Sequence, residues 1–220
     1  MTAKTPQQRV REELSSWGGK LFLVGAIVVV WLVDFALSHR LVDSGAVQGW
    51  GESVMRTFED VSTVLFIVIS LALIVAVFKD WRPLWVPLVT VYLAFSVLQV
   101  MVNVAGLIGA AHLQDDTALS GLWDVAAVYA MSVVVFMFVY ATMDITMRGG
   151  AFVWPAREGE EPPTPNLVDY LFISLNTNAT YGPTTEAVMS RRVKLIMALQ
   201  VIMAVLMLTV LIARAVAVTT

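Results

Sequence analysis

The chain has no cysteine, only two histidines and few charged residues. The absence of cysteine excludes disulfide bonds, thiolate metal sites and cysteine nucleophiles. His39 and His112 show no metal-ligand spacing, and no set of reactive groups that an intramembrane enzyme would need is apparent. We therefore expect no enzyme activity, no cofactor and no bound metal beyond a permeating cation. The net charge of −3 is small, and we expect no nucleic-acid partner.

Apolar residues dominate the composition. They make up 58% of the 220 residues, while charged residues make up 14%, against roughly 25% in soluble domains. Crossing a hydrocarbon layer about 30 Å thick takes about 20 apolar residues. Five runs approach or exceed that length, namely residues 21–37, 61–78, 84–111, 122–143 and 195–218. The sequence thus predicts an all-α integral membrane protein, multi-pass in the plasma membrane and embedded in the lipid bilayer, with about five transmembrane helices.

The polar stretches divide the chain into four parts. A polar N-terminal segment, residues 1–20, precedes a four-helix transmembrane bundle, residues 21–144. A loop rich in proline and glutamate, residues 145–165, follows the bundle. The last part, residues 166–220, holds a short helix, a polar turn and the final long helix. No polar stretch is long enough for a soluble domain.

The short apolar segment of residues 167–180 is the most informative part of the chain. Its roughly 14 residues are too few to cross the membrane, yet a spanning segment follows directly. Asn166 and Asp169 supply a helix N-cap and an acid in the first turn. A short helix, a polar turn and a spanning helix form the layout of a re-entrant pore loop. Polar backbone at membrane depth must be buried in protein or line water.

The last part of the chain resembles the pore module of prokaryotic potassium channels. That family has the approximate pattern S-L-x-T-x-T-T-V-G-Y-G-D, then a basic residue, then a helix that closes with A-R. Five positions match without a gap: Ser174, Leu175, Thr177, Thr180 and Gly182. Lys194 takes the place of the basic residue, and Ala213 with Arg214 matches the closing pair. The resemblance covers about 40 residues and implies a homotetrameric pore that conducts monovalent cations.

The filter-like turn departs from the family pattern at three positions. Tyr181, Pro183 and Thr184 replace the valine, the tyrosine and the second glycine of T-V-G-Y-G. Glycine is used in such filters where φ is positive, whereas proline fixes φ near −65°. The turn therefore predicts a shorter or wider constriction than the usual stack of carbonyl rings, and it leaves the choice between K⁺ and Na⁺ open.

We expect the ion pathway to be lined by residues of the helix end and the turn. The candidates are Thr177, Asn178, Thr180, Tyr181, Gly182, Pro183 and Thr184. Their hydroxyl and amide oxygens are suitable ligands for a partly hydrated cation, and Thr185 adds another hydroxyl. Glu186 is a candidate for a ring of carboxylates at the pore mouth, and an ordinary solvated loop acid is an equal alternative.

Two functions remain open. The first is a cation-conducting channel that resembles potassium channels, with K⁺ or Na⁺ as its partner. The alternative is a non-conducting membrane scaffold or accessory subunit that retains a pore-like fold, which Pro183 favours. Gln99, Asn103 and Gln200, the polar residues nearest mid-membrane, indicate interhelical hydrogen bonds, with a role in the ion path as the alternative. We expect Met131, Phe136, Met137, Phe138 and Met143 to serve in packing.

The basic residues and the resemblance favour opposite orientations in the membrane. With a cytoplasmic N-terminus and a re-entrant loop, 11 of the 14 lysines and arginines lie inside and three outside, as the positive-inside rule prefers. The potassium-channel resemblance implies an external loop and an external N-terminus. An inverted pore loop, as in glutamate-receptor channels, is compatible with the charge bias.

Overall fold

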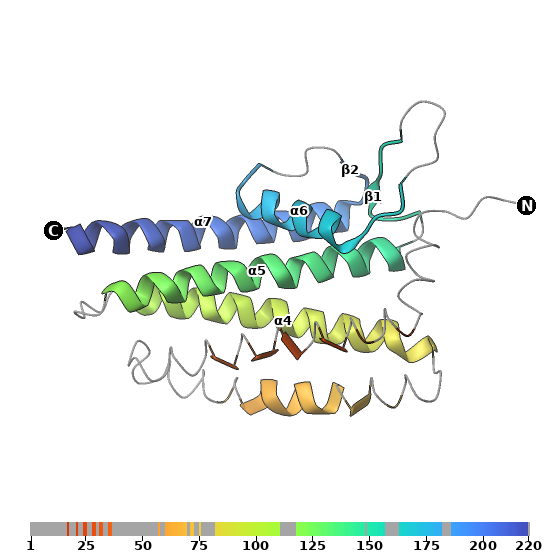
Figure 1. Ribbon diagram of the computed structural model, residues 1–220, viewed down its shortest axis with the longest axis horizontal. Coiled ribbons are helices and arrows are strands. Elements are labelled where there is room, and N and C mark those ends of the chain that lie inside the picture. The colour runs from red at the N-terminus through yellow and green to blue at the C-terminus, as the bar shows by residue number, and fades with distance from the viewer. Residues whose placement is uncertain are drawn as a thin grey trace, which may run out of the picture.

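The computed structural model describes the C-terminal two thirds of the chain almost completely and the first third only in part (Figure 1). The described residues are 17, 21, 24, 25, 28, 29, 31, 32, 35, 36, 57, 60–69, 71, 72, 75, 82–110, 118–147, 149–156, 163–181 and 186–219. Within this part, three helices of 29 residues are α4 (Arg82–Ala110), α5 (Ala118–Thr146) and α7 (Arg191–Thr219). Helix α6 (Leu167–Asn178) has 12 residues, and two short strands are β1 (Phe152–Val153) and β2 (Ala187–Val188).

Three helices of the described part are long and apolar enough to cross a membrane. The candidate spans are Val86–Ile108, Leu122–Thr146 and Arg191–Ala213. They coincide with the third, fourth and last spans expected from the sequence. A shorter apolar helix, Asp60–Ile69, covers the start of the second expected span. Of the first expected span, residues 21–37, nine residues are described, and all nine are helical. The remainder of the second expected span lies largely outside the described residues.

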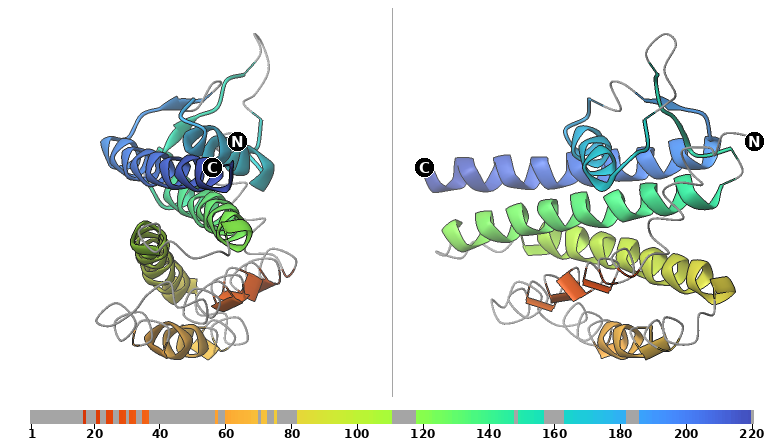
Figure 2. Two further views of the ribbon diagram at one scale, coloured as in Figure 1. Left: turned by 90° about the vertical axis from the view of Figure 1, so that its left-hand side faces the viewer. Right: turned by 45° about the vertical axis from the view of Figure 1, so that its right-hand side comes forward.

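The helices are arranged in successive layers. Helix α5 lies between α4 and α7 and runs antiparallel to both, and the helix Asp60–Ile69 lies beyond α4 (Figures 1 and 2). Because of its central place, α5 is the most enclosed of the three helices. In its most apolar stretch 61% is buried inside the protein, against 44% for α4 and 33% for α7. Helix α6 lies outside the row formed by α4, α5 and α7, against α5 and α7 (Figure 2).

The apolar interior is formed around α5. Met131, Phe136 and Met137 are buried, and Phe138 and Met143 pack partly buried against the same core, which confirms the packing role predicted for them. Large apolar side chains on α7, such as Leu195, Ile202 and Ile212, remain exposed. Exposed apolar side chains of this kind suit a surface in contact with lipid hydrocarbon.

Three helix ends differ from the sequence prediction by three or four residues, and one of them is the start of α5, at Ala118 instead of residue 122. Helix α5 continues through Asp144 to Thr146, one turn beyond the predicted end at residue 143. The carboxylate of Asp144 is fully buried and hydrogen-bonded, so it does not end the helix at a water interface. Helix α7 begins at Arg191 instead of residue 195, so Arg191, Arg192 and Lys194 lie in its first turn, ahead of the apolar run that the prediction used.

The N-terminus of α6 has the predicted cap. The side chain of Asn166 accepts hydrogen bonds from the backbone N–H groups of Val168 (2.8 Å) and Asp169 (3.3 Å). The Asp169 carboxylate in turn accepts from the Asn166 backbone N–H at 2.7 Å, which completes a capping box. Since these bonds satisfy amide groups that the helix leaves free, α6 has a defined start.

We expect Asn166→Ala to lower the stability of the protein by about 1 kcal/mol, because the capping side-chain oxygen is lost. Thermal unfolding in detergent, followed by circular dichroism, measures the effect. Asn166→Ser is the matched control, since serine retains a capping oxygen and is expected to unfold close to the wild type. Equal melting temperatures for Asn166→Ala and wild type would contradict a stabilising cap.

Candidate functional site

The chain leaves the bundle after α5 and returns to the same end before α7 (Figure 1). Strands β1 and β2 close this excursion by antiparallel pairing, with Phe152 opposite Val188 and Val153 opposite Ala187. The backbone N–H of Met189 also donates to the carbonyl of Ala151 at 3.3 Å. Helix α6 therefore belongs to a segment, residues 152–188, that begins and ends at one side of the bundle. We call it the re-entrant segment.

The carboxylate of Asp144 anchors the re-entrant segment to the end of α5. Its Oδ1 accepts hydrogen bonds from the backbone N–H groups of Ala151 (2.6 Å) and Phe152 (3.1 Å). Its Oδ2 accepts from the indole N–H of Trp154 (3.1 Å) and the hydroxyl of Tyr170 (2.8 Å). Asp144 is fully buried. Four donors, three from residues 151–154 in and beside β1 and one from α6, thus converge on one carboxylate.

Aromatic rings surround this carboxylate. Trp154 and Tyr170 meet edge to face with ring centroids 5.5 Å apart, and Tyr140 and Phe152 do so at 5.9 Å. Burial raises the pKa of Tyr170 above its ordinary value, and the nearby charge of Asp144 raises it further. The phenol of Tyr170 is therefore protonated at neutral pH and acts as a donor to the carboxylate.

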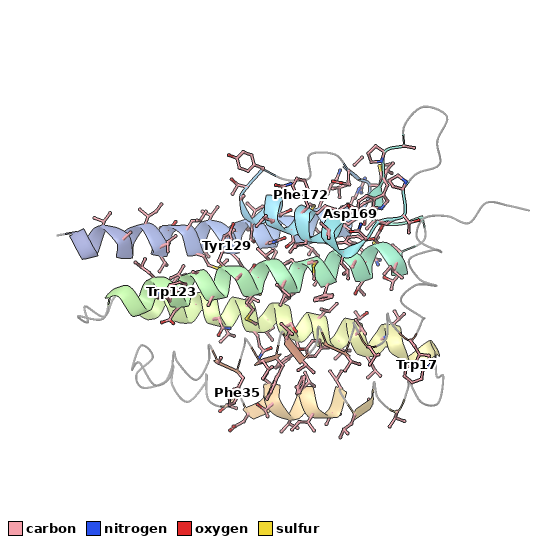
Figure 3. All side chains as sticks on the ribbon, viewed as in Figure 1. Trp17, Phe35, Trp123, Tyr129, Asp169 and Phe172 are labelled. Carbon is pink, nitrogen blue, oxygen red and sulfur yellow. The ribbon has the colours of Figure 1, made fainter. Side chains whose placement is uncertain are left out.

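The C-terminal end of α6 lies beside the middle of α5. The hydroxyl of Ser132 donates to Oδ1 of Asn178 at 3.4 Å, and Nδ2 of Asn178 donates to the carbonyl of Tyr129 at 3.4 Å. Ser132 is 12 residues before Asp144, about 18 Å along the helix, and lies near the centre of the span Leu122–Thr146. Figure 3 shows Tyr129 at this level. Helix α6 therefore descends from the end of the bundle to its mid-depth.

Gln200 on α7 connects the three helices at this depth. Its Nε2 donates to the carbonyl and the hydroxyl of Ser174, both at 3.0 Å, and to Oδ1 of Asn178 at 2.9 Å. Its Oε1 accepts from the hydroxyl of Tyr140 on α5. Ser174 also donates to the carbonyl of Val133 at 2.8 Å. We call Ser132, Tyr140, Ser174, Asn178 and Gln200 the mid-depth polar cluster.

The other two polar residues expected near mid-membrane also bond across helices. Nε2 of Gln99 donates to the hydroxyl of Ser62, and Nδ2 of Asn103 donates to the sulfur of Met131 at 3.9 Å. Together with the bonds of Gln200, these contacts confirm the interhelical hydrogen bonding that the sequence indicated. All three side chains are buried within the protein.

Helix α6 ends in a Schellman motif with an unusual residue at the left-handed position. The N–H of Tyr181 donates to the carbonyl of Asn176 at 2.9 Å, and the N–H of Thr180 donates to that of Thr177 at 3.1 Å. Thr180 has φ of 66°, the one positive φ outside glycine among the described residues. Glycine is usual there because a β-carbon is crowded by the following carbonyl.

The predicted ion-path residues fall into three groups. Thr177 and Asn178 are buried, and their side chains bond within the protein, Thr177 to the carbonyl of Ile173 at 2.7 Å. Thr180 and Tyr181 are exposed, with 81% of Tyr181 accessible. Glu186 is half-buried just before β2. The remaining candidates, Gly182, Pro183 and Thr184, lie outside the described residues, as does Thr185.

Asp144 is the residue of the candidate site that the sequence did not point to. It lies at the boundary of an apolar run, where an acid usually faces the water interface. The donors that bond to it are spread over residues 151–170, so no short sequence spacing predicts that they meet at Asp144. The available signal was compositional: an acid directly after a predicted span, followed by aromatic residues at positions 152, 154 and 170.

No protein family, curated protein or solved structure matches the chain.

We expect Asp144→Asn to destabilise the protein by about 3 kcal/mol, because an amide offers an N–H group where donors need an acceptor, and each unsatisfied buried group costs about 1–3 kcal/mol. Chemical unfolding in detergent measures the loss. Tyr170→Phe and Trp154→Phe each remove a single donor and are expected to cost less than Asp144→Asn. An Asp144→Asn variant as stable as wild type would contradict the anchoring role of the carboxylate.

We expect Thr180→Gly to stabilise the protein by about 1 kcal/mol, because glycine adopts the left-handed region without the crowding that costs other residues about 1–2 kcal/mol. The melting temperature in detergent reports the gain. Thr180→Ala is the control, since alanine keeps the β-carbon and gives no such relief. A lower melting temperature for the glycine variant than for the alanine variant would exclude strain at this position.

Proposed function

We propose that the protein is a cation-conducting, potassium-channel-like pore formed by four copies of the chain, in which the re-entrant segment provides the constriction. The observation that carries this proposal is the place where α6 ends. Asn178 bonds to residues near the middle of α5, and the next residues, Thr180 and Tyr181, are exposed. A polar turn therefore faces outward at the mid-depth of helices that have the length of membrane spans.

An exposed turn at this depth needs a particular environment. Hydrocarbon does not satisfy free backbone groups, so irregular backbone persists at membrane depth only against protein or water. One copy of the chain leaves the turn uncovered, because Tyr181 is 81% accessible. Four copies around an axis supply both protein and water around the turn. Neighbouring copies cover the flanks of the turn, and an aqueous path runs along the axis.

The electrostatics of the turn favour a cation. The backbone carbonyls at the C-terminal end of a helix carry a partial negative charge, and in α6 that end leads directly into Thr180. No basic residue lies in the last turn of α6. Where the chain comes back from the turn to the end of the bundle, Glu186 adds a carboxylate directly before β2. A permeating anion would meet unfavourable charge at both places.

Within this proposal the path is lined from Thr180 to Thr184, with Glu186 at the mouth. The side chain of Asn178 contributes by holding α6 to α7, whereas the hydroxyl of Thr177 bonds within α6. The match of Thr180 and Gly182 to the potassium-channel pattern supports a filter-like turn. The departures at Tyr181, Pro183 and Thr184 leave the preference between K⁺ and Na⁺ to measurement.

The hydrogen bonds that the side chains of Thr177 and Asn178 make inside the protein favour a second candidate function. A membrane scaffold or accessory subunit needs a rigid re-entrant segment but no open path, and the mid-depth polar cluster provides that rigidity. The two candidates differ in oligomeric state and in ion flux.

We expect purified protein in liposomes to pass monovalent cations down a potassium or sodium gradient, and to exclude chloride. Gly182→Val is expected to reduce the flux at least tenfold, since a side chain at the turn narrows the path. Gly25→Val is the matched control, because a β-carbon at Gly25 meets no atom within 4 Å. Its flux is expected to equal that of wild type.

Two results would contradict the channel. Tetrameric, folded wild-type protein that passes no cation under any applied voltage favours the accessory role. Unchanged flux through Gly182→Val would remove the turn from the ion path.

A further inference from the structure

Basic residues gather at the end of the bundle where the re-entrant segment opens. Helix α7 begins there with Arg191, Arg192 and Lys194, all exposed. The first turn of α7 contains no acidic residue. Cations at a helix N-terminus are opposed by the helix dipole, so the local structure of α7 does not account for these three charges. Their position calls for a partner outside the helix.

The opposite end of the bundle is poor in basic residues. Helix α4 begins with Arg82 at the re-entrant end, and the connection from α5 to α6 contains Arg148 and Arg157. By contrast, the connection from α4 to α5, residues 111–117, has no lysine or arginine and two aspartates. From Arg82 onward, six basic residues belong to the re-entrant end, and only Arg214 lies toward the other. The acids Glu158, Glu160 and Glu161 do not cancel this asymmetry, because acidic residues contribute little to orientation.

An exposed tryptophan marks the other side of the bundle. Trp123 lies in the second turn of α5, far from Asp144, and is 71% accessible (Figure 3). Tryptophan is enriched at membrane–water interfaces. Trp123 therefore fits the interface of one leaflet, and the basic end of the bundle fits the other.

We propose that the basic end of the bundle lies in the cytoplasm, where Arg191, Arg192 and Lys194 contact the anionic headgroups of the inner leaflet. Cytoplasmic loops carry the excess of lysine and arginine, and anionic lipids are concentrated in the cytoplasmic leaflet. The re-entrant segment then enters the membrane from the cytoplasmic side, opposite to the pore loop of potassium channels. This inference rests on α4, α5 and α7 crossing a membrane and is independent of ion conduction.

The absence of cysteine makes the test direct, since one introduced thiol is the only one in the chain. Ser190→Cys places it at the re-entrant end, and Ala118→Cys places it at the first residue of α5. Intact cells that express the full chain are treated with a membrane-impermeant maleimide. We expect Ala118→Cys to be labelled in intact cells, and Ser190→Cys to be labelled at least tenfold more after permeabilisation than before.

Labelling of Ser190→Cys in intact cells, with Ala118→Cys protected, would overturn the proposal, as would equal labelling of both. An alkaline phosphatase fused after residue 220 checks the result without a thiol, because α7 carries the C-terminus to the opposite side. The fusion is expected to be active, and an inactive fusion on expressed, membrane-inserted protein would contradict the orientation.

The contribution of the three basic residues in the first turn of α7 is tested in the Ser190→Cys variant. Replacing Arg191, Arg192 and Lys194 by glutamine is expected to raise labelling of Ser190→Cys in intact cells severalfold. The matched control replaces Arg214 by glutamine and is expected to leave the labelling unchanged. Equal labelling of the triple variant and its parent would show that these three cations do not hold the orientation.

Discussion

The hydrogen bonds to Asp144 are the constraint on which the arrangement of the re-entrant segment depends. The carboxylate joins the last turn of α5 to the start of β1 and, through Tyr170, to the first half of α6. A buried carboxylate is tolerated only when its lone pairs are used, so this geometry admits little variation. The position at which α6 begins, at the end of the bundle, follows from these hydrogen bonds to Asp144. The direction of α6 then determines how far the chain extends toward the middle of α5.

A second set of polar contacts fixes the lower end of α6. Lipid tails are as apolar as leucine, so burial of apolar surface does little to bring helices together within a membrane, and hydrogen bonds and close packing take over. Gln200 holds Ser174 and Asn178, while α5 contributes Ser132 and Tyr140. With both ends of a 12-residue helix fixed, the position of the turn that begins at Thr180 is determined by two clusters that lie away from it.

Features that depend on local sequence were predicted well. The apolar runs located α4, α5 and α7 to within four residues at each end, and the spacing of Asn166 and Asp169 located the start of α6 together with its cap. Features that depend on distant partners were not predicted. The β1–β2 pairing joins residues 34 and 36 positions apart, and the role of Asp144 appears only when Tyr170, 26 positions away, is folded against it. The hydrogen-bond partners of Asn178 show the same limit, since Ser132 lies 46 positions before it and Gln200 lies 22 positions after it.

The order of the chain has a consequence for biosynthesis. The polar side chains of Ser174 and Asn178 bond to Gln200, which is made 22 residues after Asn178. While α6 leaves the ribosome it is too short to insert as a span, and one of its partners does not yet exist. The bonds that hold the C-terminal end of α6 to α7 therefore form only after this part of α7 has been made. Helix α7 thus completes the contacts of the segment that precedes it.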